Sequence, residues 1–284
     1  MSSVLKPQDR LYIYVVQGRI PWDAFADVPE FVGNWQEGDQ AFLFFSRASL
    51  PRVETLVSGS PELALTDHFQ SSYEEWLGTP VQGFRLGPLQ VHPVWETGAE
   101  QGGDGRLIRM DPGVVFGAGN HQTTSDCLRA LVTLCEQAGP EAVHAFHVLD
   151  MGCGSGLLSL AAAGLGCERV LALDLNPLAV RTCRKNSLLN ALETRILSVQ
   201  GRAEEWMDRP ADVVLANIHY DVLQELVQVP GFDRKPWFIL SGLLRSQARD
   251  VLAILKRKGA TLIKIWDEDG TWFTVLGRNV YCSN

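Results

Sequence analysis

The sequence predicts an α/β protein with a doubly wound, mainly parallel sheet that ends in an antiparallel hairpin. A small α+β domain of the ferredoxin-like type is expected before it. Two observations lead to this fold class. In the second half of the chain, short apolar runs alternate with helical segments, which is typical of a parallel sheet covered on both faces. The first 70 residues instead follow the order β-α-β-β-α-β, as in a ferredoxin-like sandwich.

The N-terminal elements are predicted from runs of β-branched and aromatic residues, from a proline at a helix start and from a turn at 37–39. They are a strand at 11–16, a helix at 21–27, strands at 31–35 and 41–45, a helix at 50–57 and a strand at 63–69. Residues 1–70 are therefore predicted to form the first domain.

Residues 71–105 are rich in Gly, Pro and Glu and are predicted to link the two domains. A hairpin is expected at 84–92. The polar, glycine-rich segment 97–105 is the expected flexible break. The second domain is accordingly placed at 106–284.

In the second domain, the apolar runs predict buried strands and the intervening segments predict helices. The strands are expected at 146–150, 170–174, 196–200, 213–216 and 238–241, and the helices at 123–137, 177–190, 220–227 and 245–258. Segments 261–266 and 272–276 flank a polar turn and predict the closing hairpin.

The composition disfavours several classes of protein. With 25 Lys and Arg against 33 Asp and Glu, the net charge of −8 disfavours a protein that grips nucleic-acid phosphates. The chain has no apolar run long enough for a membrane helix and no secretory signal at its polar start. Its six cysteines contain no CxxC pair, so we expect reduced core thiols in a cytoplasmic protein, without a disulfide framework or a zinc site.

The strongest motif is VLDMGCGSGLL at 148–158, where a predicted strand ends at Asp150 and a helix follows a tight turn. Gly152, Gly154 and Gly156 allow a ligand to approach the backbone closely, because no Cβ stands in the way. The position between a strand and a helix makes this pattern more specific than a lone G-x-G.

Two cofactors are candidates for binding at this turn. A nicotinamide cofactor favours G-x-G-x-x-G, but position 157 is Leu157 and the third glycine is Gly156. Asp174 ends the next strand, 22 residues after Gly152, where a carboxylate accepts hydrogen bonds from ribose hydroxyls. The glycine spacing favours S-adenosylmethionine, which has no pyrophosphate. A plain strand-turn-helix with a capping acid is the alternative.

Two further segments point to the same crevice. Asn217 ends the strand in DVVLANI, at the sheet edge where Gly152 and Asp174 are expected; the alternative is a helix N-cap. The segment DPGVVFGAGNHQTT at 111–124 predicts a loop that covers the crevice, with hydroxyls from Thr123 and Thr124. An ordinary loop with a helix cap explains this segment equally well.

Taken together, DPGVVFGAGNHQTT, VLDMGCGSGLL, LALDLNPLAV, DVVLANI and ILSGLL resemble the ribosomal protein L11 methyltransferase family over about 76–276. The resemblance implies a class I methyltransferase domain that uses S-adenosylmethionine, behind a small substrate-recognition domain. It implies Thr124, Gly152, Asp174 and Asn217 as cofactor residues. The glycine turn itself adds Gly154 and Gly156 to the predicted cofactor residues. The family methylates amino groups of a ribosomal protein, at lysine side chains and an N-terminus.

Within this resemblance, Asn217 is predicted to position the acceptor nitrogen through its side-chain or backbone carbonyl, which makes it the catalytic candidate. The chain departs from the family after Ile218, where His219, Tyr220 and Asp221 replace small and apolar residues. His219 or Asp221 is a candidate to deprotonate the acceptor, the alternative being a polar helix start.

Residues 117–120 also depart from the family, because Gly-Ala-Gly-Asn replaces a threonine-bearing version of that loop. His121 is expected to shape the loop. The open alternatives are a methyltransferase for another protein, a small molecule or RNA, and a non-catalytic protein that binds S-adenosylmethionine.

Overall fold

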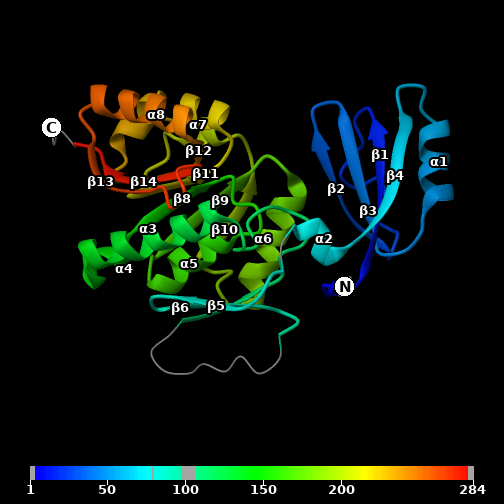
Figure 1. Ribbon diagram of the computed structural model, residues 1–284, viewed down its shortest axis with the longest axis horizontal. Helices are drawn as coiled ribbons and strands as arrows, with labels where there is room; N and C mark the ends of the chain where they lie inside the picture. Colours follow the sequence, from blue (N-terminus) through cyan, green and yellow to red (C-terminus); the bar gives the residue numbers. More distant parts are fainter. Residues whose placement is uncertain (1–3, 79, 97–105, 281–284) are drawn as a thin grey trace.

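The computed structural model describes residues 4–78, 80–96 and 106–280. This part of the chain contains a four-stranded, a three-stranded and a seven-stranded sheet. Figure 1 shows the four-stranded sheet at one end of the molecule and the seven-stranded sheet at the other. The expected break at 97–105 lies outside the described residues.

The four-stranded sheet comprises β1 (Arg10–Gln17), β2 (Phe31–Glu37), β3 (Gln40–Phe45) and β4 (Ala64–Ser72). Its order is β2-β3-β1-β4 and each neighbouring pair is antiparallel, which is the order of a ferredoxin-like sheet. Helix α1 (Leu50–Ser58) packs against it through the buried Val53. The predicted strands and this helix are confirmed.

The helix predicted at 21–27 is wrong, because this segment forms successive turns. The Asn34 side-chain amide donates to the carbonyls of Ile20 and Pro21, at 3.3 Å each, and so holds the start of the segment. The amide of Ala24 also bonds the Pro21 carbonyl three residues back, as in a turn. These bonds take carbonyls at the start of the segment away from helical hydrogen bonds and hold it as turns.

The segment 71–96 is more ordered than a linker. It contains α2 (Tyr73–Leu77), which the sequence analysis missed, and the predicted hairpin of β5 (Phe84–Leu86) and β6 (Leu89–Pro93). A capping box between Ser72 and Glu75 starts α2. Strand β6 pairs in parallel with β7 (Arg106–Met110), which was also missed.

The seven-stranded sheet has the order β10-β9-β8-β11-β12-β14-β13. Strand β14 is antiparallel to both of its neighbours, while the other pairs are parallel, so the predicted parallel sheet and closing hairpin are confirmed. The strands are β8 (His147–Met151), β9 (Arg169–Asp174), β10 (Ile196–Gln200), β11 (Val213–Asn217), β12 (Trp237–Leu244), β13 (Thr261–Trp266) and β14 (Trp272–Arg278).

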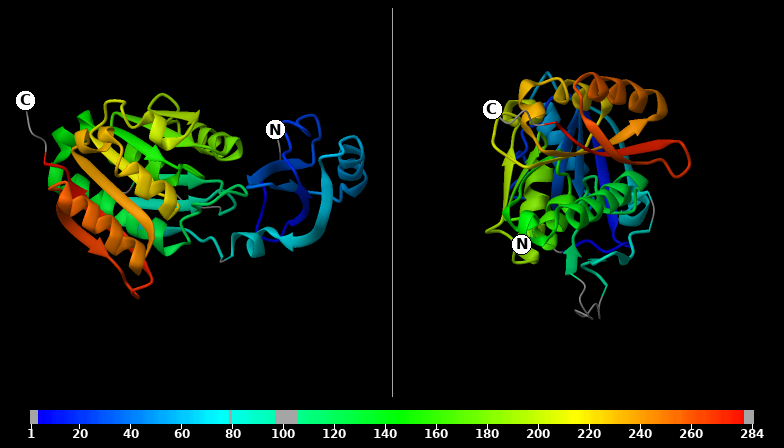
Figure 2. Two further views of the ribbon diagram at one scale, coloured as in Figure 1. Left: turned by 90° about the horizontal axis from the view of Figure 1, so that it is seen from above. Right: turned by 90° about the vertical axis from the view of Figure 1, so that its left-hand side faces the viewer.

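Helices cover both faces of this sheet (Figures 1 and 2). One face carries α3 (Gln122–Ala138), α5 (Leu157–Leu165) and α6 (Pro177–Leu189), and the other carries α7 (Tyr220–Leu226) and α8 (Arg245–Arg257). The short α4 (Pro140–Ala145) follows α3. No helix in the described part of the chain is both long and apolar enough to span a membrane.

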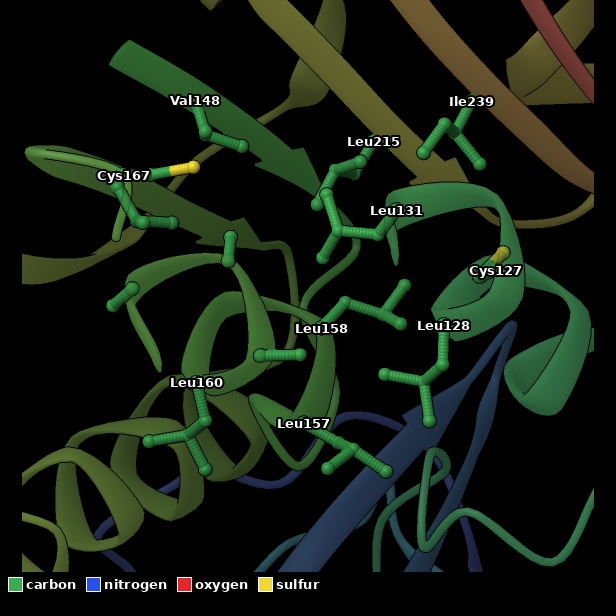
Figure 3. Close-up of a cluster of buried hydrophobic side chains, with 14 of the residues drawn as sticks. Cys127, Leu128, Leu131, Val148, Leu157, Leu158, Leu160, Cys167, Leu215 and Ile239 are labelled. Carbon is green, nitrogen blue, oxygen red and sulfur yellow. The ribbon is translucent and has the colours of Figure 1, made fainter. Parts of the chain in front are cut away.

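Strand β11 shows why a central strand of the large sheet is apolar at every position. Val213 and Leu215 pack with the α3 and α5 side, whereas Val214 and Ala216 pack with the α7 and α8 side. Successive side chains of a strand point to opposite faces, so a strand buried on both sides is apolar at every position. Figure 3 shows the first of these clusters, in which side chains of α3 and α5 meet those of the strands.

The four-stranded sheet lies directly against the larger body, at one end of it in the left view of Figure 2. Ile13 and Phe44 of the small sheet share an apolar cluster with Val115 and Leu178 of the large body. The Tyr73 hydroxyl also donates to the Gly113 carbonyl at 2.7 Å. The N-terminal sheet thus forms a packed wall beside the loop 111–121.

Candidate active site

The carboxyl ends of β8, β9 and β11 meet at one edge of the large sheet, where they border a cavity of about 470 Å³. Of the six residues predicted to bind the cofactor, four line this cavity: Gly152, Gly154, Asp174 and Asn217. They come from segments up to 65 residues apart, and the parallel strand order brings them together.

The glycine turn requires its glycines for two reasons. Gly152 and Gly154 have φ values of +76° and +52°, which side chains with a Cβ rarely adopt. A Cβ on Gly152 would meet the Ile218 side chain, and one on Gly154 would meet the Phe116 carbonyl. Glycine is therefore required at both positions for the backbone of this turn to pass so close to the cavity.

Asp174, at the end of β9, stabilises this turn through hydrogen bonds. Its Oδ2 accepts from the backbone N–H of Gly154 and its Oδ1 from that of Asn176, both at 2.9 Å. Burial raises the pKa of Asp174, and the hydrogen bonds to these N–H groups oppose that rise. Each carboxylate oxygen retains a second lone pair for a ligand hydroxyl.

The N–H groups of the turn are engaged within the protein. Those of Gly152 and Cys153 both donate to the Leu173 carbonyl at 2.8 Å, and that of Ser155 donates to the Phe116 carbonyl at 2.9 Å. The turn thus does not present the set of free N–H donors that a pyrophosphate requires.

Two predicted cofactor residues lie behind the cavity and not on its wall. Thr124 is buried, and its hydroxyl oxygen accepts from the Asn217 side-chain amide at 3.5 Å. Gly156 precedes α5, and a Cβ there would lie 2.6 Å from the Cys183 sulfur. Thr124 orients Asn217, whereas Gly156 allows α6 to pack against the turn.

His121 lies at the start of α3 and lines the cavity. Its Nδ1 accepts from the Thr123 N–H at 3.3 Å, and its ring lies between Phe116 and Trp272 with centroid distances of 5.4 and 5.3 Å. Burial lowers the pKa of His121, which favours the uncharged ring. These contacts shape the loop 111–121.

The residues after Ile218 differ in their access to the cavity. His219 lines it, whereas Tyr220 and Asp221 are not among its lining residues. The Tyr220 hydroxyl donates to Asp250 at 3.4 Å on the outside of α7. Of the two candidates for deprotonating the acceptor, His219 is thus the one beside the cavity.

Several residues that line the cavity were not predicted from the sequence. Residues 201–204 follow β10 at the same sheet edge, so the rule that identified Asp174 and Asn217 could also have found them. Trp272 begins β14 and Trp35 belongs to β2 of the small sheet. No motif marks these two tryptophans.

This arrangement defines the class of protein. Counted along the chain from β8, the strand order is 3-2-1-4-5-7-6 with strand 7 antiparallel, which is the sheet of class I methyltransferases. The cofactor of this class is S-adenosylmethionine.

The comparisons with known proteins specify the family. Residues 64–279 match the model for ribosomal protein L11 methyltransferase (PrmA). The chain belongs to this family. Residues 1–63 lie outside the match.

Individual relatives agree with this assignment. The ribosomal protein L11 methyltransferase of Staphylococcus saprophyticus is 33% identical over 192 residues, or 67% of this chain and 59% of that protein. The protein of the same name from Pelotomaculum thermopropionicum is 35% identical over 215 residues, or 73% and 66%. The matched region thus spans less than two thirds of these curated relatives.

Among solved structures, the ribosomal protein L11 methylase from Lactobacillus delbrueckii subsp. bulgaricus superimposes with a TM-score of 0.58 and 25% identity. The superposition covers 70% of this chain and all of that one.

Proposed function

We propose that this protein transfers a methyl group from S-adenosylmethionine to an amino group of a ribosomal protein such as L11. The acceptor is a lysine side chain or the N-terminus. The observation that carries the proposal is the meeting of Gly152, Asp174 and Asn217 on one cavity, in a chain of this family.

The cavity suits this cofactor. The glycine turn admits a ligand against its backbone, and Asp174 retains lone pairs for ribose hydroxyls. The N–H groups of Gly152, Cys153 and Ser155 are already bonded, which suits a cofactor without a pyrophosphate. We assign Gly152, Gly154, Asp174 and Asn217 to the cofactor wall, with Thr124 and Gly156 supporting it.

When bound, the cofactor would supply a methyl group on a positively charged sulfur. The acceptor nitrogen would form the new N–C bond with its lone pair, and the C–S electron pair would stay on sulfur to give a neutral thioether. A lysine, with an ordinary pKa of about 10.4, must lose a proton first. The protein therefore aligns the amine and favours its neutral form.

Asn217 is placed for this alignment. Its amide NH₂ donates to Thr124, which leaves the side-chain carbonyl free to accept a hydrogen bond from the acceptor N–H. That bond directs the nitrogen lone pair at the methyl carbon. His219, two residues further along the same cavity wall, receives the proton that the amine loses.

The proposal also assigns a role to each part of the chain. Residues 1–70 recognise the substrate, 71–105 connect the two parts, and 106–284 bind the cofactor and catalyse the transfer. A cytoplasmic location suits a ribosomal substrate and the free thiols of Cys127, Cys135, Cys153, Cys167 and Cys183.

Two measurements test the proposal. Calorimetry with S-adenosylmethionine should show one binding site, and labelled methyl transfer to purified L11 should exceed transfer to a cell lysate at equal protein mass. Binding without transfer to either would favour a non-catalytic protein. Transfer only to another lysate component would replace L11 as the acceptor, and absence of binding would contradict the whole proposal.

A further inference from the structure

A second cavity of about 450 Å³ lies beside the cofactor cavity. The two cavities share Trp35, Val115, Phe116 and His121 as lining residues, so they are neighbours across these four side chains. The rest of the second cavity is lined by residues of α2, the residue after it and the loop 111–121. It therefore lies between the N-terminal wall and the cofactor cavity.

Two tryptophans, Trp35 of β2 and Trp76 of α2, line this cavity, and packing holds both. Trp35 and Trp76 meet edge to face with centroids 6.4 Å apart, and Trp76 packs on Phe44 at 4.7 Å. The Trp76 indole N–H also donates to the Val114 carbonyl at 3.3 Å. The aromatic surfaces of the cavity are thus preformed.

The chemistry of the lining selects a neutral, apolar occupant. Its lining residues include no Asp, Glu, Lys or Arg, and its single histidine, His121, has a pKa lowered by burial. A protonated amine would lose hydration here without a counter-charge, so the neutral amine is favoured. Methylenes pack well against tryptophan rings.

Phe116 gives a second reason to place a ligand here. Its side chain is 49% exposed although it borders both cavities. A large aromatic residue left open at the junction of two cavities offers contact area to a bound chain.

We infer that the second cavity is the entrance for the acceptor and takes an unbranched alkylamine, the side chain of a lysine. Its methylenes lie against Trp35 and Trp76, and its nitrogen passes Phe116 and His121 to reach Asn217. This inference rests on the proposed function. Trp35 precedes residue 64, where the family match begins, so the unmatched segment supplies part of the entrance.

The lysine side chain is favoured over a protein N-terminus. An N-terminal amine carries its own peptide group within a few bonds and would bring that polar group among the tryptophans. A lysine places four methylenes between its nitrogen and its backbone. The net charge of −8 also attracts a lysine-bearing surface.

The first test detects binding without catalysis. The full chain is labelled with 5-fluorotryptophan, saturated with S-adenosylhomocysteine and titrated with Nα-acetyl-lysine N-methylamide, with fluorine resonances assigned from Trp→Phe variants. We expect the Trp35 and Trp76 resonances to shift and that of Trp22 to stay. Trp22 is the matched control because it is exposed, faces Arg181 and lines neither cavity. A titration that leaves both Trp35 and Trp76 unmoved would overturn the inference.

The second test is kinetic. Trp76→Leu and Trp35→Leu should each raise the KM for the acceptor protein about tenfold or more, while Trp22→Leu leaves it unchanged. Trp76 does not line the cofactor cavity, so its variant should keep the cofactor Kd within about twofold. Trp76→Phe retains a ring and should recover most of the affinity; it also serves if the leucine variant is unfolded.

The two proposals fail in different ways. Wild-type protein that neither binds the cofactor nor transfers methyl groups would contradict the proposed function. Active wild-type protein whose KM is insensitive to both Trp35 and Trp76 would contradict the entrance alone.

Discussion

Asp174 Oδ2 accepts a hydrogen bond from the backbone N–H of Gly154 at 2.9 Å, which ties the end of β9 to the turn after β8. The carboxylate that we propose binds the ribose therefore also holds the glycine turn. Under that proposal, one side chain both fixes the turn and accepts hydrogen bonds from ligand hydroxyl groups.

Asp174→Asn should weaken the binding of S-adenosylmethionine by about 10- to 150-fold, because hydrogen bonds to charged groups contribute about 1.5–3 kcal/mol. Calorimetry measures this change. Asp67→Asn, which replaces an exposed carboxylate on β4, is the control and should bind like the wild type. An Asp174→Asn protein with a Kd within twofold of the wild type would contradict the role of Asp174.

Gly154→Ala and Gly38→Ala form a matched pair. Their φ values are +52° and +56°, but a Cβ on Gly154 would meet the Phe116 carbonyl whereas one on Gly38 enters open space. We expect Gly38→Ala to cost about 1–2 kcal/mol of unfolding free energy from backbone strain. Gly154→Ala should cost more and abolish detectable cofactor binding. Urea unfolding and calorimetry compare the two, and equal costs would show that the close approach has no energetic effect.

Asn217→Ala should lower kcat by a factor of about 100 or more, since positioning the nucleophile is a large part of the rate enhancement. The cofactor Kd should change much less, because the glycine turn and Asp174 remain. Single-turnover rates with saturating cofactor separate the two effects. If the rate falls only in proportion to cofactor occupancy, Asn217 acts on binding and not on the acceptor.

His219→Gln and Asp221→Asn test the proton acceptor. Only His219 lines the cavity, so its variant should lower kcat near neutral pH by about 100-fold or more, in the range of general-base effects. Asp221→Asn should retain wild-type turnover. Equal rates for His219→Gln and the wild type would indicate that the amine loses its proton to solvent.

The buried carboxyl of Asp150 should make the unfolding free energy depend on pH. It is buried beside Ser159, whose hydroxyl donates to Oδ2 at 2.5 Å, and burial raises its pKa from 3.8 to about 6. The folded state thus holds this proton more tightly than the unfolded state. Its contribution, up to about 3 kcal/mol, is present below pH 3.8 and is lost as the pH rises through about 6.

Asp150→Asn keeps a neutral polar side chain at every pH. The fall in unfolding free energy between pH 4 and 7 should therefore be smaller in this variant than in the wild type, as measured by urea titration. Glu54→Gln, an exposed change on α1, should leave the wild-type slope unchanged. A slope that is the same in all three proteins would show that Asp150 ionises at an ordinary pH.

Local sequence patterns were sufficient to predict most strands of the large sheet. The apolar run at 213–216 became β11, because a strand buried on both faces must be apolar throughout. The turn glycines were recognisable because positive φ angles select glycine. Segment 21–27 was mispredicted because the Asn34 amide, from a later strand, binds its first carbonyls.

The sequence by itself determined the fold class of the large sheet, the glycine turn and the two polar residues at the ends of β9 and β11, since each depends on contacts within a short segment or on the general geometry of parallel sheets. Only the tertiary structure decided that Thr124 lies behind Asn217 and that Trp35 reaches the cavity. Those positions arise from packing between elements far apart in the chain, where no periodicity or motif specifies which side chains meet.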